Sequence, residues 1–118
     1  MAANLPRISE QRVYDPIGPD GTVQLDTPAW FAWLAAATTT RFSYALYDRR
    51  VGYIVGFMTV RKERRQRGSD YWVAYRRVGG QLRKVYIGSG GAVTTQRLQA
   101  VAYRLHGKEV AGNEQAGQ

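Results

Sequence analysis

Residues 71–87 read Tyr71-Trp72-Val73-Ala74-Tyr75-Arg76-Arg77-Val78-Gly79-Gly80-Gln81-Leu82-Arg83-Lys84-Val85-Tyr86-Ile87. The Gly79-Gly80 pair tolerates the positive φ angles of a tight hairpin turn, so the stretch predicts two antiparallel strands joined at these glycines. The turn also sets the register of the two strands. The predicted cross-strand pairs are Val78 with Gln81, Arg76 with Arg83, Ala74 with Val85, and Trp72 with Ile87.

Side chains of a strand alternate between its two faces, so one face of this hairpin can pack on the core while the opposite face carries a different set of residues. The apolar members of one face lie away from the turn, where a helix can cover them, and we assign that face to the core. Arg76 and Arg83 share it but lie near the tip, where they can reach solvent. The core face carries Trp72, Ala74, Val85 and Ile87, and the opposite face carries Tyr71, Val73, Tyr75, Arg77, Leu82, Lys84 and Tyr86.

A helix that can cover the hairpin is predicted directly downstream. Leu98, Val101, Ala102 and Leu105 recur at the spacing of one helical stripe. Thr94 or Thr95 is a suitable cap for its start, and Gly107 is well placed to end it. Upstream, residues from Phe57 to about Glu63 predict a third strand, which the polar loop 64–70 joins to the hairpin.

The first part of the chain divides at about residue 25. Residues 1–25 are rich in Pro, Gly and Asp and predict a loop-like arm with turns. Asp26-Thr27-Pro28 is a typical helix start, because a capping residue precedes a proline. Trp30, Trp33, Leu34 and Ala37 share one face of that helix. Packing in a core is the expected role of this stripe, and an aromatic platform for bases is the alternative.

Residues 41–47 and 51–57 predict a further hairpin around Asp48-Arg49-Arg50. The alternation of Phe42, Tyr44 and Leu46 with their neighbours does not identify which face of this strand is buried. Gly52 and Gly56 are candidates for bulges or close backbone contacts.

The expected fold is a small α+β domain. It has an antiparallel sheet of three to five strands packed on a C-terminal helix, with an additional N-terminal helix. The expected division is an arm at 1–25, one nucleic-acid-binding domain at 26–107 and a flexible tail at 108–118.

The positive charge of the chain is concentrated on the predicted sheet. The formal net charge is +8, and 12 of the 17 Lys and Arg residues lie between residues 41 and 89, with three of the nine acids. Such asymmetry is typical of a protein that binds a polyanion. A basic surface that is merely solvated is the alternative.

The residues for catalysis and metal binding are sparse. The chain has no cysteine and one histidine, His106, at the predicted helix end, which excludes disulfides and the common zinc sites. The acids are scattered, and Gly88-Ser89-Gly90-Gly91 lacks the lysine and spacing of a P-loop. We therefore expect neither an enzyme nor a cofactor, metal or small-molecule site. No apolar run has membrane-spanning length and no signal peptide is recognisable, so a cytoplasmic location is expected.

The order of these segments resembles known DNA-binding domains. A basic strand, a Tyr-Trp strand, a Gly-Gly turn, an Arg-Lys strand and a helix are similar to the three-stranded domains of tyrosine-integrase arm modules and of the plant AP2 type. The motifs Thr59-Val60-Arg61-Lys62-Glu63-Arg64, Tyr71-Trp72-x-Ala74-Tyr75-Arg76 and Arg83-Lys84-x-Tyr86-Ile87-Gly88 also resemble uncharacterised bacterial segments of mobile-element and regulatory proteins. The resemblance covers about half of the chain. It implies that the exposed sheet face enters the major groove of DNA.

The resemblance and the charge pattern together name the candidate site residues. Arginine matches guanine with two hydrogen bonds, which makes Arg61 and Arg77 candidates for base readout. The loop arginines are expected to bind flanking phosphates. The full candidate set is Arg61, Arg64, Arg65, Arg67, Tyr71, Tyr75, Arg77, Lys84 and Tyr86. The expected partner is double-stranded DNA, and the alternatives are RNA or another single strand bound by the tyrosines, or an acidic protein partner.

Overall fold

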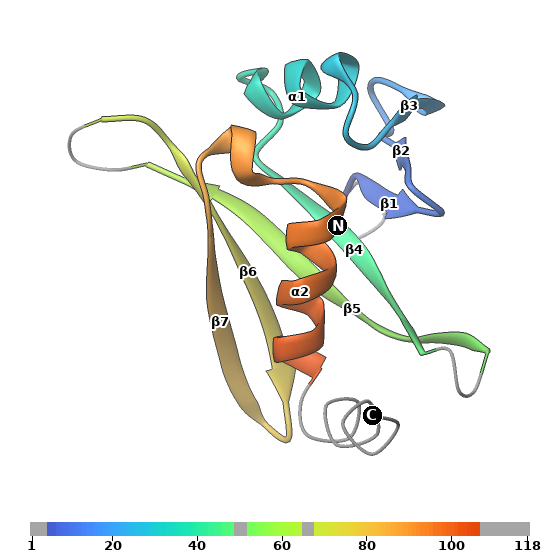
Figure 1. Cartoon of the computed structure of the whole chain (residues 1–118), viewed down its shortest axis with the longest axis vertical. Helices are drawn as coiled ribbons and strands as arrows, with labels where there is room; N and C mark the ends of the chain where they lie inside the picture. Colours follow the sequence, from blue (N-terminus) through green and yellow to red (C-terminus); the bar gives the residue numbers. More distant parts are fainter. Residues whose placement is uncertain (1–4, 49–51, 65–67, 107–118) are drawn as a thin grey trace.

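One twisted sheet of seven strands dominates the computed structural model, which describes residues 5–48, 52–64 and 68–106 (Figure 1). The strands are β1 (Arg7–Ser9), β2 (Arg12–Tyr14), β3 (Asp20–Gln24), β4 (Arg41–Asp48), β5 (Tyr53–Glu63), β6 (Tyr71–Val78) and β7 (Gln81–Gly88). Their order in space is β3-β2-β1-β4-β5-β6-β7. β1 pairs with β4 in parallel, and every other neighbouring pair is antiparallel. The sheet is therefore mixed.

The expected fold class was wrong in the size and the kind of the sheet. We expected three to five antiparallel strands with a helix at the N-terminal end, whereas the described residues form seven strands in a mixed sheet, and the first helix follows three of them. The additional strands come from residues 7–24, expected as a loop-like arm. They are short, and the parallel pairing begins with the Ser43 amide donating to the Pro6 carbonyl at 2.8 Å. Contacts this distant in sequence leave no local periodic pattern.

The β6–β7 hairpin, here called the ribbon, has the register that the Gly-Gly turn predicts over most of its length. Ala74 pairs with Val85, and Arg76 pairs with Arg83. Gly79 and Gly80 have φ angles of 58° and 82°, which glycine adopts without steric cost. The pairing of Trp72 with Ile87 was wrong, because a bulge between Trp72 and Val73 shifts the partner to Gly88.

Both helices begin where the sequence places them. Helix α1 (Pro28–Ala35) is capped by Thr27, whose Oγ1 accepts from the Trp30 amide at 3.3 Å. Helix α2 (Thr95–His106) is capped by Thr94, whose Oγ1 accepts from the Arg97 amide at 3.2 Å. A 3₁₀ turn, η2 (Gly90–Ala92), links β7 to α2 at the end of the glycine-rich segment 88–91.

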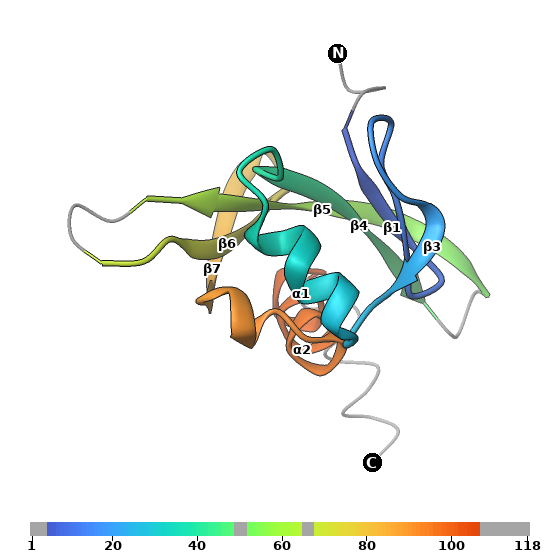
Figure 2. The ribbon, with the colours of Figure 1, turned by 90° about the horizontal axis from the view of Figure 1, so that it is seen from above.

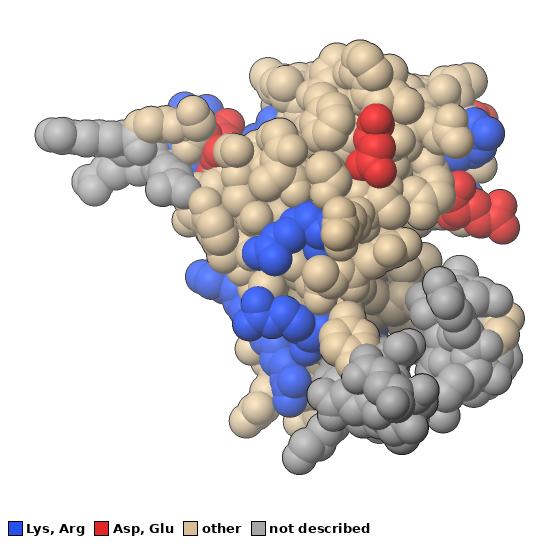
Figure 3. All heavy atoms as spheres, in the orientation of Figure 1, with Lys and Arg blue, Asp and Glu red and all other residues tan. Residues whose placement is uncertain are grey.

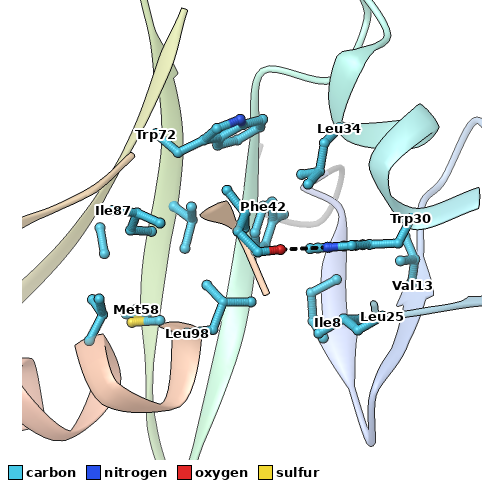
Figure 4. Close-up of a cluster of buried hydrophobic side chains, with 14 of the residues drawn as sticks. Ile8, Val13, Leu25, Trp30, Leu34, Phe42, Met58, Trp72, Ile87 and Leu98 are labelled. Atoms are coloured by element: carbon cyan, nitrogen blue, oxygen red, sulfur yellow. Dashed lines mark hydrogen bonds between the residues drawn. The ribbon is translucent and has the colours of Figure 1, made fainter. Parts of the chain in front are cut away.

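Aromatic side chains join α1 to the centre of the sheet (Figure 4). The Phe42 ring lies 5.6 Å from the Trp30 ring and 5.6 Å from the Trp72 ring, measured between centroids. Trp30 also donates from Nε1 to the Val93 carbonyl at 2.7 Å, so its polar atom is satisfied inside the core. The Trp30 and Trp33 stripe is therefore core, as expected. It is not a platform for bases.

The two helices cover the same side of the sheet, as Figure 2 shows. Phe42, Val60 and Ala74 are fully buried beneath them, in consecutive cross-strand pairs of β4, β5 and β6. Phe42, Tyr44 and Leu46 thus form the core face of β4, which the sequence left open. Neither helix of the described residues has the length and apolar character needed to cross a membrane.

We expect Trp72→Ala to lower the free energy of unfolding by about 3–5 kcal/mol, the usual cost of truncating a buried aromatic side chain. Trp72 is only 2% exposed and contacts the Phe42 ring. Urea unfolding measures the change. Leu82→Ala is the control, because Leu82 lies on the same ribbon at 58% exposure. Equal stability of the two variants would show that the core face has been assigned wrongly.

Candidate nucleic-acid interface

The face of the sheet opposite the helices has no helix over it in the described part of the chain (Figure 2). Cross-strand pairing places one row of side chains on this uncovered face across every described strand. The row reads Asp20, Tyr14, Arg7, Ser43, Thr59, Tyr75 and Lys84, from β3 to β7. A second row brings Arg41 of β4 beside Arg61 of β5. Cations and aromatic rings therefore lie together on a surface that solvent reaches.

The ribbon supplies most of the sequence-predicted residues to this uncovered face. They are Tyr71, Tyr75, Arg77, Lys84 and Tyr86, with Arg61 on the adjoining strand β5. Val73 lies among them and is only 1% exposed, although no helix covers it. Its cross-strand neighbours are Arg61 and Tyr86, and the rings of Tyr71 and Tyr86 lie 5.7 Å apart between centroids on the same face. The candidate residues thus form a packed layer on the sheet.

Tyr75 is at the centre of this layer. The Arg61 guanidinium carbon lies 5.9 Å from the centre of its ring, and the Lys84 Nζ lies 6.0 Å from it. Both distances are at the limit for a cation–π attraction. The Tyr75 hydroxyl donates to the Glu63 carboxylate, and the Tyr71 hydroxyl donates to the other oxygen of the same carboxylate at 3.1 Å. Glu63 therefore fixes both tyrosines.

The tyrosine hydrogen bonds change the acidity of both partners. The hydrogen bond from Tyr75 lowers the pKa of Glu63, and the hydrogen bond from Tyr71 and the charges of Lys84 and Arg61 lower it further. The same bond to Glu63 raises the pKa of Tyr75. Glu63 is thus ionised at neutral pH, and the two hydroxyl protons point toward it.

Cations also lie on the helix-facing side of the ribbon, near its tip. Figure 3 shows Lys and Arg atoms gathered over this part of the ribbon and beside α2. Arg76 and Arg83 are a cross-strand pair on that side, and Arg83 is exposed. Gly56 of β5 allows the position of Arg76, because a Cβ atom there would lie 2.7 Å from the Arg76 Nη2 atom. The sequence had marked Gly56 as a possible close contact, and the structure supplies the partner.

Three candidate arginines belong to the loop between β5 and β6. Arg64 is highly exposed, and its Nε lies 3.7 Å from an Asp70 carboxylate oxygen, a surface pair that contributes little to stability. Arg65 and Arg67 lie outside the described residues. The structure therefore places Arg64 directly after β5, near Asp70, and leaves the positions of the other two as predictions.

Several residues of the uncovered face were missed by the sequence analysis. Arg7 and Tyr14 belong to strands that were expected as loops, and Ser43 and Arg41 belong to a strand whose faces were left open. Glu63 was recognised only as part of a basic run. The signal that identifies it is the register of β5 with β6, which pairs Glu63 with Tyr71.

Comparison with known proteins adds no functional assignment, since no family model, curated protein or solved structure matches this chain. Within the described ranges, no three metal-ligating side chains gather into a cluster. The chemistry of the site rests on its guanidinium, ammonium, phenol and carboxylate groups.

We expect acid to remove the stabilisation that Glu63 provides. Because the pKa of Glu63 is lower in the folded chain than its ordinary value of 4.5, its contribution is complete above that value and is lost as the pH falls through the folded pKa. The difference in unfolding free energy between the parent and Glu63→Gln should therefore shrink between neutral and acidic pH. Urea unfolding across this range measures it.

Glu10→Gln is the matched control for this experiment, because Glu10 is an exposed carboxylate in the turn between β1 and β2. The difference in unfolding free energy between Glu10→Gln and the parent should contain no contribution from the tyrosine hydrogen bonds. A parent-to-Glu63→Gln difference that stays constant with pH would contradict the network.

Proposed function

We propose that this chain binds double-stranded DNA, with the β6–β7 ribbon in the major groove. The observation that carries the proposal is the charge of the ribbon, where four cations lie within four residues of the turn and no acid occurs between residues 71 and 88. The cations are Arg76 and Arg83 on one face and Arg77 and Lys84 on the other. A ribbon in a groove meets polyanionic backbone on both sides, so cations on both faces suit that position.

The dimensions of the sheet favour the ribbon over the whole face. Neighbouring strands lie about 4.8 Å apart, and the major groove is about 12 Å wide and admits a two-stranded ribbon. The complete sheet is too wide to enter. Figure 1 shows the tip of the ribbon extending along and beyond α2, so the helix leaves the tip accessible.

These dimensions assign different roles to the candidate residues. Arg77 lies on the ribbon, and in the unbound chain its Nη1 donates to the nearby Gly80 carbonyl at 3.3 Å, an exposed bond that a base edge can replace. Arg61 lies on β5, outside the ribbon, and with Arg41 and Arg64 it suits the phosphates beside the groove. Base readout by Arg77 and phosphate binding by the flanking cations follow the usual division in protein–DNA complexes.

The proposed role is in transcription regulation or mobile-element biology, in keeping with the resemblance to integrase-arm and AP2-type domains. The cytoplasm, at the nucleoid if the source is a bacterium, is the corresponding location. The proposal includes no catalytic step.

Binding of single-stranded RNA or DNA is the second candidate. The observation that favours it is the exposure of aromatic rings on the uncovered face, where Phe57 is 57% and Tyr86 is 49% exposed. Stacking of bases on such rings is typical of single-strand recognition. Competition between a duplex, its separate strands and the matching RNA distinguishes the two candidates.

We expect the affinity for duplex DNA to fall steeply with salt. The logarithm of the association constant should decrease with the logarithm of salt concentration with a slope of about −0.9 per phosphate neutralised. Fluorescence anisotropy with a labelled duplex measures it. An affinity that hardly changes between low and physiological salt would refute binding by the basic surface, and would favour a protein partner instead.

We expect Arg77→Ala to weaken binding to the preferred sequence more than to scrambled duplex, by about 1–3 kcal/mol, because a bidentate base contact discriminates by that amount. The preferred sequence comes from selection out of a random duplex pool. Arg83→Ala should instead weaken both duplexes equally and make the salt slope shallower by about one unit.

Arg12→Ala is the matched control for these two variants. It removes the same charge from β2, near the opposite end of the sheet, and should change neither specificity nor the slope. Equal losses on both duplexes for Arg77→Ala would show that Arg77 does not read sequence.

A further inference from the structure

A shallow depression lies on the uncovered face, away from the ribbon. Its volume is about 590 Å³, and it is lined by Leu5, Arg7, Tyr14, Asp15, Pro16, Asp20, Ser43 and Phe57. Arg7, Ser43 and Tyr14 belong to the row that continues through Thr59 to Tyr75 and Lys84. The depression and the ribbon are therefore two ends of one continuous surface.

Two aromatic rings line the depression in different ways. Tyr14 is held between the Arg7 guanidinium carbon, 4.6 Å from the ring centre, and the backbone of Gly21, where a Cβ atom would lie 3.0 Å from the ring. Gly21 has a φ angle of 88°, so the close approach and the backbone angle both favour glycine here. Phe57 is more than half exposed. The first ring is a fixed wall, and the second offers an open face for stacking.

The charges of the depression differ from those of the ribbon. Asp15 accepts from the Trp33 Nε1 at 3.0 Å and from the Ile17 amide at 3.1 Å, so its carboxylate is held at the rim. Asp20 is exposed on β3. Two carboxylates in the lining of one depression oppose a phosphate group. A neutral, planar group with hydrogen-bonding edges suits these acids and the Arg7 guanidinium better than a phosphate does.

We propose that the depression receives one unpaired nucleobase, stacked on Phe57, from a single strand that extends from a duplex bound by the ribbon. The inference rests on the proposed DNA-binding function and names its substrate as a duplex with a single-stranded extension. Three strand spacings, about 14 Å, separate β6 from β1, which a strand of a few nucleotides spans. Arg61 and Arg41 lie on the intervening strands β5 and β4, on the same face and in the row next to Thr59 and Ser43, and suit the phosphates of that strand.

The experiment compares a short blunt duplex with the same duplex carrying an overhang of a few nucleotides at either end, using the full chain and fluorescence anisotropy. Stacking of one base should make the binding of the overhang duplex about 5- to 150-fold tighter. The base analogue 2-aminopurine in the overhang should lose fluorescence on binding. Phe57→Ala should abolish both effects and leave the blunt duplex bound as before.

Ile17→Ala is the matched control, because Ile17 is 78% exposed and does not line the depression. This variant should keep both the tighter binding of the overhang duplex and the loss of 2-aminopurine fluorescence. Binding of the blunt duplex with no gain from either overhang would overturn this inference and leave the proposed function standing. Binding of neither duplex would overturn both. An equal loss on blunt and overhang duplexes for Phe57→Ala, with unchanged thermal unfolding, would also overturn the inference.

Discussion

The contact of Phe42 with three tryptophans is the constraint on which the rest of the structure depends. Its ring lies between 5.6 and 5.7 Å from those of Trp30, Trp33 and Trp72, so one residue of β4 joins α1 to the ribbon. The large aromatic residues of the core thus lie on one side of the sheet, and burying their area requires both helices to lie there too. Among the described residues, the other side of the sheet has no comparable apolar cluster, and no helix covers it.

The ribbon and the helices were predictable because their signals are local. The Gly79-Gly80 turn and the period of two define the faces of the ribbon, and the spacing of Leu98, Val101 and Leu105 defines α2. The N-terminal strands were not predictable in the same way. Strands of three residues carry no measurable period, and the parallel pairing of β1 with β4 joins Arg7 to Ser43 across 36 positions. The sheet was therefore underestimated in size, and its mixed character was missed.

The contrast between local signals and long-range pairing also explains which residues of the candidate site were predicted. The ribbon residues Tyr75, Arg77 and Lys84 were assigned to one face from alternation alone, and the structure places them on that face. Arg7 and Tyr14 were missed because the strands that carry them were not predicted. Glu63 was missed because its role depends on its hydrogen bonds with Tyr71 and Tyr75. Only the register of β5 with β6 brings these tyrosines to it.

Glu63 shows how a basic surface retains order. Cations packed over a sheet repel one another, and a carboxylate among them reduces that repulsion. Because this carboxylate also accepts hydrogen bonds from Tyr71 and Tyr75, it fixes the Tyr75 ring, near which both Arg61 and Lys84 lie. Arg61 and Lys84 are thereby held near Tyr75 in the unbound chain. Side chains held in this way lose less conformational entropy when a ligand binds than freely moving side chains do, and the carboxylate lowers the positive charge of the surface in exchange.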